Sequence, residues 1–510
     1  MNRHVLTLSA LAMLAAGCAV GPDYQRPALA VPAAYLEPAA AASTATRYAA
    51  QQDIRRDWWT LFRSPVLNAL IERAFSANPS IEEAQAALQV AQENVGAQRG
   101  YFFPAVQAGY SPARTKIAGN LGGNSPGIQG NGSVIQTGEG TPASEGGKGP
   151  YNTPVLYSFH TAQLTVGYTP DIFGANRREL ESSEAQQRAE RLQLEAAYIT
   201  LASNIAAAAF QDALLRRQIE VVEQIIAANR QAVALARRQR DAGYTSGQEL
   251  AAQLNAAAQA AQLLPPLRRQ FEQNRDLLRV LAGIAADGAV PAFTLDSFTL
   301  PQELPLSLPS QLIEQRPDIR MAEEQLRAAT AQAGVARAAR LPQFSISATA
   351  GGAASQFGQM FWNSGKFFDV TASLVQPLFD GGTLKHRERA ANAAMRGAVA
   401  AYKSTVARAY QDVADVLHAI DAGDAELQAA RAAQDAADNL RVLAARQHAN
   451  GYLDRLALLA AEQDQWQAQL ALTQAQASRL GNAAALFQAL GGGWWQREDG
   501  AAAGAVRPGS

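Results

Sequence analysis

The chain has 510 residues, a formal net charge of −1 at pH 7, one cysteine and five histidines. This length allows two to four ordinary domains or one long structure, and the balanced charge gives no bulk electrostatic reason to expect nucleic acid binding. The single cysteine excludes an internal disulfide and the paired-cysteine motifs of metal and redox sites.

Residues 1–17 are predicted to be an export signal peptide. Arg3 supplies the positive charge, and the apolar core from Val5 to Ala16 is too short to span a bilayer. Cys18 directly follows small residues, as in a bacterial lipobox, and we predict that it carries a lipid anchor. The alternative is that Cys18 is an ordinary residue of a discarded signal. No later stretch is an uncharged apolar run of about 18 residues, which excludes a bundle of membrane-spanning helices.

The mature chain is predicted to contain one unit twice. Residues 18–60 form a lipidated, irregular segment, residues 61–290 a first repeat and residues 311–495 a second repeat. The segment from Asn78 to Pro104 has the spacing of a helix, with Asn78 as a possible cap and Pro79 in the first turn. A shift of 238 residues aligns this segment with residues 316–342. We expect Pro104 and Pro342 to mark the junctions between helix and strand.

After each of these helices the apolar period changes to two, which predicts two hairpins at about residues 104–170 and 342–377. Their strands are about ten residues long, the length of a transmembrane β-strand, and their polar faces of Thr, Ser and Gln suit a wet lumen. A soluble sandwich would alternate in the same way. The apolar positions are Val106, Ala108, Tyr110, Ala162, Leu164, Val166, Tyr168, Phe344, Ile346, Ala348, Ala350, Phe368, Val370, Ala372 and Leu374.

Four strands cannot close a barrel, because single-chain barrels begin at about eight strands and an open edge in lipid leaves backbone groups unpaired. The barrel must therefore be assembled from several chains, and the strand count alone allows two, three or four. The first hairpin also carries about 30 extra residues, which we place in the Gly-rich loop 118–154.

Two very long helices are predicted, each followed by a turn and a returning helix. The stretches from Phe173 to Gly243 and from Phe379 to Gly451 are each about 70 residues long, or about 100 Å as helix. Gly243-Tyr244 and Gly451-Tyr452 are predicted to be turns at a tip, and the helical pattern then resumes for about 40 residues. Residues 291–310 are predicted to be an irregular, Pro-rich linker, and residues 496–510 a flexible tail.

Several motifs together resemble the TolC-like outer-membrane factors of efflux systems, and most closely their lipoprotein (NodT/OprM-like) branch. They are "CAVGPDYQRP" from Cys18, the Trp58-Trp59 pair, "RPDIRMAEEQLRAATAQAGVARAARLPQFSISATAG", "PLFDGG" and "LFQALGGGW", and the match covers nearly the whole mature chain.

The resemblance implies a mostly α-helical fold with a β-barrel portion, in which a homotrimer closes twelve strands above a hollow α-barrel in the periplasm. It implies a passive, lipid-anchored exit duct in the outer membrane. The tips would meet a periplasmic adaptor (membrane fusion protein) coupled to an inner-membrane pump of the RND or MFS type. No cofactor, metal or nucleic acid is expected.

The resemblance also indicates where a periplasmic gate would lie. In relatives, aspartates narrow the tip and bind cations, but the positions six and nine residues past Gly451 are Ala457 and Ala460 here. Glu249 does match an acidic position of the first repeat. We expect Glu249, Arg446, Asp454 and Arg455 to be gate or tip charges, and the alternative is that they are ordinary exposed charges beside a helix turn.

Three other functions are weighed against the efflux duct. The same fold could serve type I protein secretion, or the chain could be a coiled-coil scaffold without conductance. An enzyme is least supported, because the sequence contains only five histidines, no HExxH or P-loop motif, and no paired carboxylates in a plausible pocket.

Overall fold

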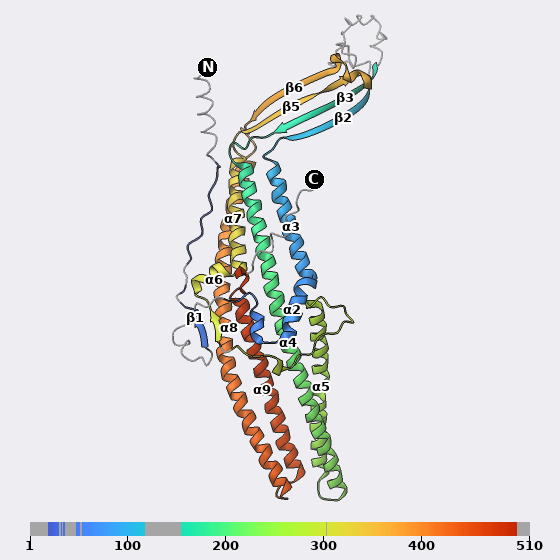
Figure 1. Ribbon diagram of the computed structural model, residues 1–510, viewed down its shortest axis with the longest axis vertical. Helices are drawn as coiled ribbons and strands as arrows, with labels where there is room; N and C mark the ends of the chain where they lie inside the picture. Colours follow the sequence, from blue (N-terminus) through green and yellow to red (C-terminus); the bar gives the residue numbers. More distant parts are fainter. Residues whose placement is uncertain are drawn as a thin grey trace. The chain divides into compact units, whose positions relative to one another are not determined.

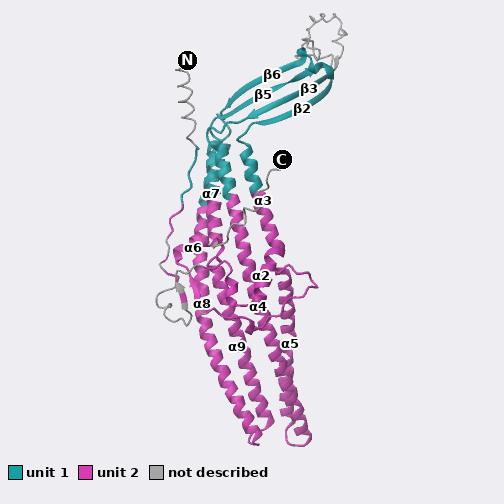
Figure 2. Cartoon of the chain, in the orientation of Figure 1, with its two compact units in different colours: residues 1–25, 92–185, 327–397 teal, residues 26–91, 186–326, 398–510 magenta. Residues whose placement is uncertain are grey.

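A computed structural model describes residues 19–29, 32, 34–35, 47–50, 54–117, 155–301 and 303–496. The signal peptide, Cys18, the Gly-rich loop 118–154 and nearly all of the expected tail lie outside the described residues. The chain divides into two compact units, residues 1–25, 92–185 and 327–397 in unit 1 and residues 26–91, 186–326 and 398–510 in unit 2 (Figure 2). Each unit draws on both sequence repeats, so the compact units are not the repeats themselves.

Long helices dominate the chain (Figure 1). Equivalent helices of the two repeats have equal lengths: 22 residues in α3 and α7, 67 in α4 and α8, and 35 in α5 and α9. In chain order the elements are β1 (Arg47–Ala50), η1 (Trp58–Phe62), α2 (Pro65–Ala77), α3 (Pro79–Gly100), β2 (Ala105–Ile117), β3 (Val155–Tyr168), α4 (Ala175–Asp241), α5 (Gly247–Leu281), η3 (Leu295–Ser297), β4 (Glu303–Leu306), α6 (Pro309–Gln315), α7 (Pro317–Ala338), β5 (Gln343–Ala354), η4 (Phe357–Phe361), η5 (Asn363–Gly365), β6 (Lys366–Val375), α8 (Thr383–Ala449), α9 (Arg455–Ala489) and η6 (Trp494–Gln496).

The predicted helix start at Asn78 is confirmed. Its side-chain Oδ1 accepts a hydrogen bond from the backbone N–H of Ser80 at 2.8 Å, and its amide Nδ2 donates to the carbonyl of Leu281 at 2.8 Å. One side chain therefore caps α3 and also satisfies a carbonyl at the end of α5.

Unit 1 contains a four-stranded antiparallel sheet in the order β2-β3-β5-β6. The strands are 10 to 14 residues long, and the second hairpin joins the first through β3 and β5. Both predicted hairpins are confirmed, and they form one continuous sheet.

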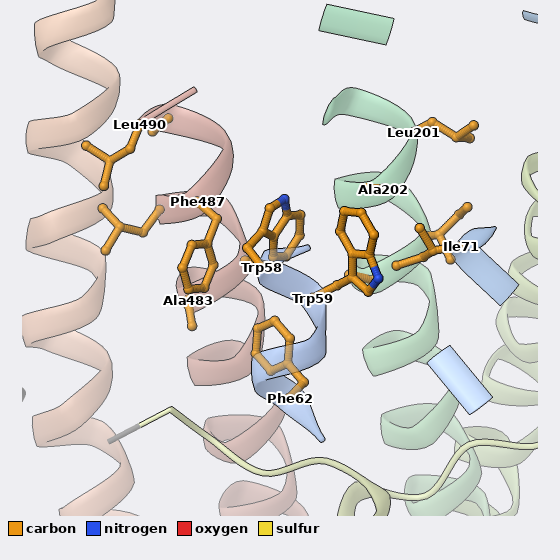
Figure 3. Close-up of a cluster of buried hydrophobic side chains, with 14 of the residues drawn as sticks. Trp58, Trp59, Phe62, Ile71, Leu201, Ala202, Ala483, Phe487 and Leu490 are labelled. Atoms are coloured by element: carbon orange, nitrogen blue, oxygen red, sulfur yellow. The ribbon is translucent and has the colours of Figure 1, made fainter. Parts of the chain in front are cut away.

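The core of unit 2 is built around Trp58 and Trp59. Trp58 is fully buried and stacks on Phe487 of α9, with ring centroids 5.2 Å apart, while Phe62 meets Phe210 of α4 edge to face at 5.0 Å. The short helix η1 thus lies between α4 and α9 (Figure 3). A fully buried aromatic side chain contributes about 1.5–3 kcal/mol by its removal from water, so η1 is a strong link between the repeats.

The N-terminal segment and the linker, which were predicted to be irregular, each contain a short strand. β1 and β4 pair in parallel, with Tyr48 opposite Leu304. Neither segment is long enough to show a periodic pattern, and each becomes a strand only through the backbone hydrogen bonds of the other. Leu304 is fully buried in the hydrophobic core of unit 2.

Three arginines of α4 and α5 in unit 2 hold residues 288–293, the stretch that leads into the linker. Arg279, Arg275 and Arg216 donate to the carbonyls of Gly288, Val290 and Phe293 at 3.1, 2.9 and 3.2 Å. The fully buried Asp212 lies 3.5 Å from Arg216 and 3.6 Å from Arg275, and it accepts the backbone N–H of Phe293 at 3.3 Å. Burial raises the pKa of Asp212 above its ordinary 3.8, against the opposing effect of that N–H and the two arginines.

The N-terminal segment of unit 1, described over residues 19–25, is fixed by close contacts with α4 and α7. The N–H of Val20 donates to the carbonyl of Phe173 at 3.1 Å. Gly21 has φ +120°, and a Cβ there would lie 2.4 Å from the Cα of Gly334 in α7. Asp23 accepts a hydrogen bond from the nearly buried Arg178 of α4 at 2.5 Å. Because Gly21 and Gly334 have no side chains, their backbones can approach more closely than any other pair of residues would allow.

Candidate functional site: the sheet and the helix tips

The two faces of the sheet differ in chemistry along every strand. Cross-strand rows such as Val106–Val166–Ala348–Val370 and Ala108–Leu164–Ala350–Phe368 lie on one face, called here the apolar face. Many of its large side chains are exposed in the single chain, 71% for Val370 and 82% for Phe368. Soluble proteins rarely expose apolar patches of this extent, which indicates a face made for lipid.

The opposite face of the sheet is polar. The hydroxyls of Thr165 and Thr349 lie 3.4 Å apart, and the hydroxyl of Thr371 donates to the carboxylate of Asp369 at 2.9 Å. Hydroxyl, amide and glycine positions alternate with the apolar ones, so this face can line water.

The expected junction residues lie between helix and strand. Pro104 stands immediately before β2, and Pro342 immediately before β5. At the second junction the side-chain amide of Gln376 donates to the carbonyl of Arg340 at 3.1 Å, and that of Gln343 to the carbonyl of Leu341 at 2.9 Å. These amides satisfy backbone acceptors where the helix ends.

Both tip turns are closed by the same backbone motif. The N–H groups of Tyr244 and Tyr452 donate to the carbonyls of Gln239 and Gln447 at 2.8 and 2.9 Å. Gly243 and Gly451 have φ of 79° and 75°, in the left-handed region that glycine occupies without strain. The tyrosine side chains are 86% and 84% exposed, so each turn presents one aromatic ring to its surroundings.

The four candidate gate charges are divided between the two tip turns. Glu249 lies in the first turn of α5, where its carboxylate accepts the hydroxyl of Thr245 at 2.8 Å. Asp454 caps α9 by accepting the N–H of Ala457 at 2.7 Å. Arg455 bonds Gln231 of α4 at 3.2 Å and lies 3.4 Å from Glu462, while Arg446 is exposed in the last turn of α8. Arg446, Asp454 and Arg455 thus flank the second turn, and Glu249 belongs to the first.

Sequence reasoning missed His448 at the second tip. Its Nδ1 lies 2.9 Å from the carbonyl of Leu453, and this contact spans the turn from α8 to α9. Its position in the last turn of α8, three residues before Gly451, could have indicated a contact with the turn.

Within the part of the chain that the structure describes, no three His, Cys, Asp or Glu side chains gather as metal ligands. In the same residues, no helix combines the length and the hydropathy needed to cross a bilayer.

The chain resembles known efflux proteins along nearly its whole length. The family model for "Outer membrane efflux protein" matches residues 70–284 and 308–492. The toluene efflux pump outer membrane protein TtgC and the antibiotic efflux pump outer membrane protein ArpC, both of Pseudomonas putida, are each 29% identical to it over 504 residues, which cover 98% of this chain and 97% of each relative.

Solved structures agree with these relatives. The outer-membrane channel OprN has 26% identity and a TM-score of 0.78 over 94% of this chain and 100% of its own. The CmeC outer membrane channel of Campylobacter jejuni has 19% identity and a TM-score of 0.79 over 94% and 96%, and it bears on the fold alone. The expected TolC-like fold of long helices and antiparallel strands is confirmed. The chain belongs to the outer membrane efflux protein family, and it is the outer-membrane channel component of an efflux pump rather than an enzyme.

Proposed function

We propose that three copies of the chain form one lipid-anchored channel, which passively conducts small molecules from a pump and a periplasmic adaptor to the exterior. The apolar face of the sheet would lie against outer-membrane lipid, and the helices would form a hollow cylinder in the periplasm.

The observation that carries this proposal is the pair of open edges of the sheet. β2 and β6 are the edge strands, and successive strands are antiparallel. β6 of one copy can therefore pair with β2 of the next in the same antiparallel sense. In lipid an unpaired edge is prohibitive, and twelve strands lie within the known range for closed sheets. The strand count alone permits two, three or four copies, and the family resemblance favours three.

The lipid anchor is proposed at Cys18. The next residue, Ala19, contacts Gly174 immediately before α4, where a Cβ on that glycine would lie 2.7 Å from the Cα of Ala19. An acyl group on Cys18 would thus start close to the strand–helix junction. One acyl chain binds membranes weakly, whereas three acylated copies would hold firmly.

The tips are proposed to meet the adaptor through Gly243-Tyr244 and Gly451-Tyr452, with Glu249, Arg446, Asp454 and Arg455 as gate or tip charges. The two exposed tyrosines support this role, because aromatic side chains are enriched at protein interfaces. The inner-membrane partner would be a pump of the RND or MFS type. The relatives' names include toluene, antibiotics and pyoverdine, so we propose small organic molecules as cargo.

The assembly is tested on purified full-length protein in detergent. Native mass spectrometry is expected to show three chains per particle, and planar bilayers are expected to show ion conductance. A monomer that stays soluble without detergent would contradict the shared sheet, and trimers without conductance would point to a scaffold.

A further inference from the structure

The apolar face changes character along the strands. Nearest the helix junctions its rows carry apolar and aromatic side chains, from Phe344–Leu374 through Tyr168–Ile346–Ala372 to Ala108–Leu164–Ala350–Phe368. The next row contains Tyr110, Ala162, Gly352 and Lys366, so a cation appears in the fifth row. Further along the same face, β2 carries Arg114 and Lys116.

An aromatic cluster lies where the apolar rows end. The hydroxyl of Tyr110 and Nδ1 of His160 are 2.9 Å apart, and the two rings are stacked with centroids 6.1 Å apart. Phe357 of η4 meets both rings edge to face, at 5.8 and 6.4 Å. Aromatic side chains of this kind gather where a membrane protein passes from hydrocarbon to headgroups.

The spacing agrees with that position. From Phe344 to Gly352 the strand advances eight residues, roughly 27 Å along its axis, and a tilt of about 40° reduces this to roughly 20 Å of height. The apolar band of an outer-membrane sheet is about 25 Å tall. Tyr110 and Lys366 therefore lie at the edge of the band, and Arg114 and Lys116 lie beyond it.

The charges at the edge of the band and beyond it are all positive. Arg114, Lys116 and Lys366 are exposed. Asp369 is the single acidic residue among the described residues of the four strands and of the connection from β5 to β6. Asp369 lies on the opposite, polar face, where it accepts the hydroxyl of Thr371. No described acid on the apolar face neutralises these cations.

We propose that Arg114 and Lys116 of β2 and Lys366 of β6, with Tyr110, His160 and Phe357 at the same end of the sheet, bind phosphate-bearing lipid headgroups of the leaflet on this side. This surface is called here the headgroup surface, and it rests on the proposed placement of the sheet in the membrane. Guanidinium and ammonium groups donate charge-assisted hydrogen bonds to phosphate oxygens, and the aromatic rings hold the boundary between acyl chains and headgroups.

The test uses the purified full-length protein and two lipids, lipid A with both phosphates and the same lipid A after removal of both. Bound lipid is counted by native mass spectrometry during titration. The variant is R114Q/K116Q/K366Q, and the matched control is R114K/K116R/K366R, which keeps every charge. Conductance in phosphatidylcholine bilayers is recorded for each protein.

The wild-type protein and the control are expected to bind the phosphorylated lipid roughly 100-fold more tightly, because each cation near an anionic surface contributes about a factor of five. The glutamine variant is expected to conduct normally and to lose this preference, and added salt is expected to weaken the wild-type binding. Equal binding of both lipids by a conducting wild-type channel would overturn the headgroup surface alone. A wild-type protein that neither assembles nor conducts would overturn the proposed function, and the headgroup surface with it.

Discussion

Gly96 and Gly334 occupy the same position of the two repeats, yet their surroundings differ. A Cβ on Gly96 would meet nothing within 4 Å. A Cβ on Gly334 would lie 3.0 Å from Cγ of Arg178 and 3.1 Å from the carbonyl of Val20. The N-terminal segment packs on the second position only, so close contacts call for glycine at 334 but not at 96.

Alanine substitution at the two positions tests this difference. We expect G96A to raise the free energy of unfolding by about 1 kcal/mol, because alanine favours helix. We expect G334A to lower it by about 1–3 kcal/mol through crowding. Thermal unfolding in detergent measures both. Equal stabilisation by the two substitutions would show that the N-terminal segment does not pack on α7.

Substitution of the buried Asp212 tests whether its acceptor oxygen or its charge stabilises the fold. D212A leaves the N–H of Phe293 without its acceptor, and we expect a loss of about 1–3 kcal/mol. D212N keeps an acceptor oxygen and is expected to remain close to the wild type. If D212N is as unstable as D212A, the charge of Asp212 rather than its acceptor oxygen holds the linker.

The same pair of proteins gives a pH dependence. Burial raises the folded-state pKa of Asp212 above 3.8, so the folded chain binds more protons than the unfolded chain just above that pH. Its contribution to stability is therefore greatest in acid and decreases as the pH rises through the folded-state pKa. Unfolding midpoints measured between about pH 4 and pH 7 should show this decrease in the wild type, and D212N should lack it.

At the scale of elements, periodicity was enough to predict the strands and the long helices. The alternation at Val106–Tyr110 and Phe368–Leu374 depends only on the two-residue period of a strand, and both stretches are strands here. β1 and β4 could not be predicted, because four-residue segments become strands only by pairing across more than 250 positions of sequence. The contact of His448 with Leu453 could not be predicted either, because it depends on the backbone conformation of the turn.

Two adjacent residues of β6 test the assignment of the faces. Val370 lies on the apolar face and Thr371 on the polar face. V370R places a cation near the bilayer midplane and is expected to cost about 2–4 kcal/mol, which reduces the yield of assembled channel. T371R is expected to assemble and to shift conductance towards anions. A normal yield of V370R together with failure of T371R would reverse the faces.

At the scale of the whole molecule, assembly and anchoring should be separable. We expect C18A, secreted with a signal peptide that does not direct lipidation, to form trimers of normal conductance, because the proposed contact of the sheet with lipid does not need the anchor. The control carries the same signal peptide and retains Cys18. Native mass spectrometry and bilayer recording are the measurements. Loss of trimers in C18A alone would show that residue 18 has a structural role instead of an anchoring one.

The equal lengths of the paired helices restrict how this chain can change in evolution. The repeats differ by about 30 residues at the loop 118–154, yet α4 and α8 both contain 67 residues and α5 and α9 both contain 35. An insertion in one long helix would rotate every later side chain about the helix axis by about 100° per added residue. The equivalent helix of the other repeat would then need the same insertion to keep the two lengths equal. Insertions and deletions among homologous chains should therefore accumulate between strands, and foreign peptides should be tolerated there first.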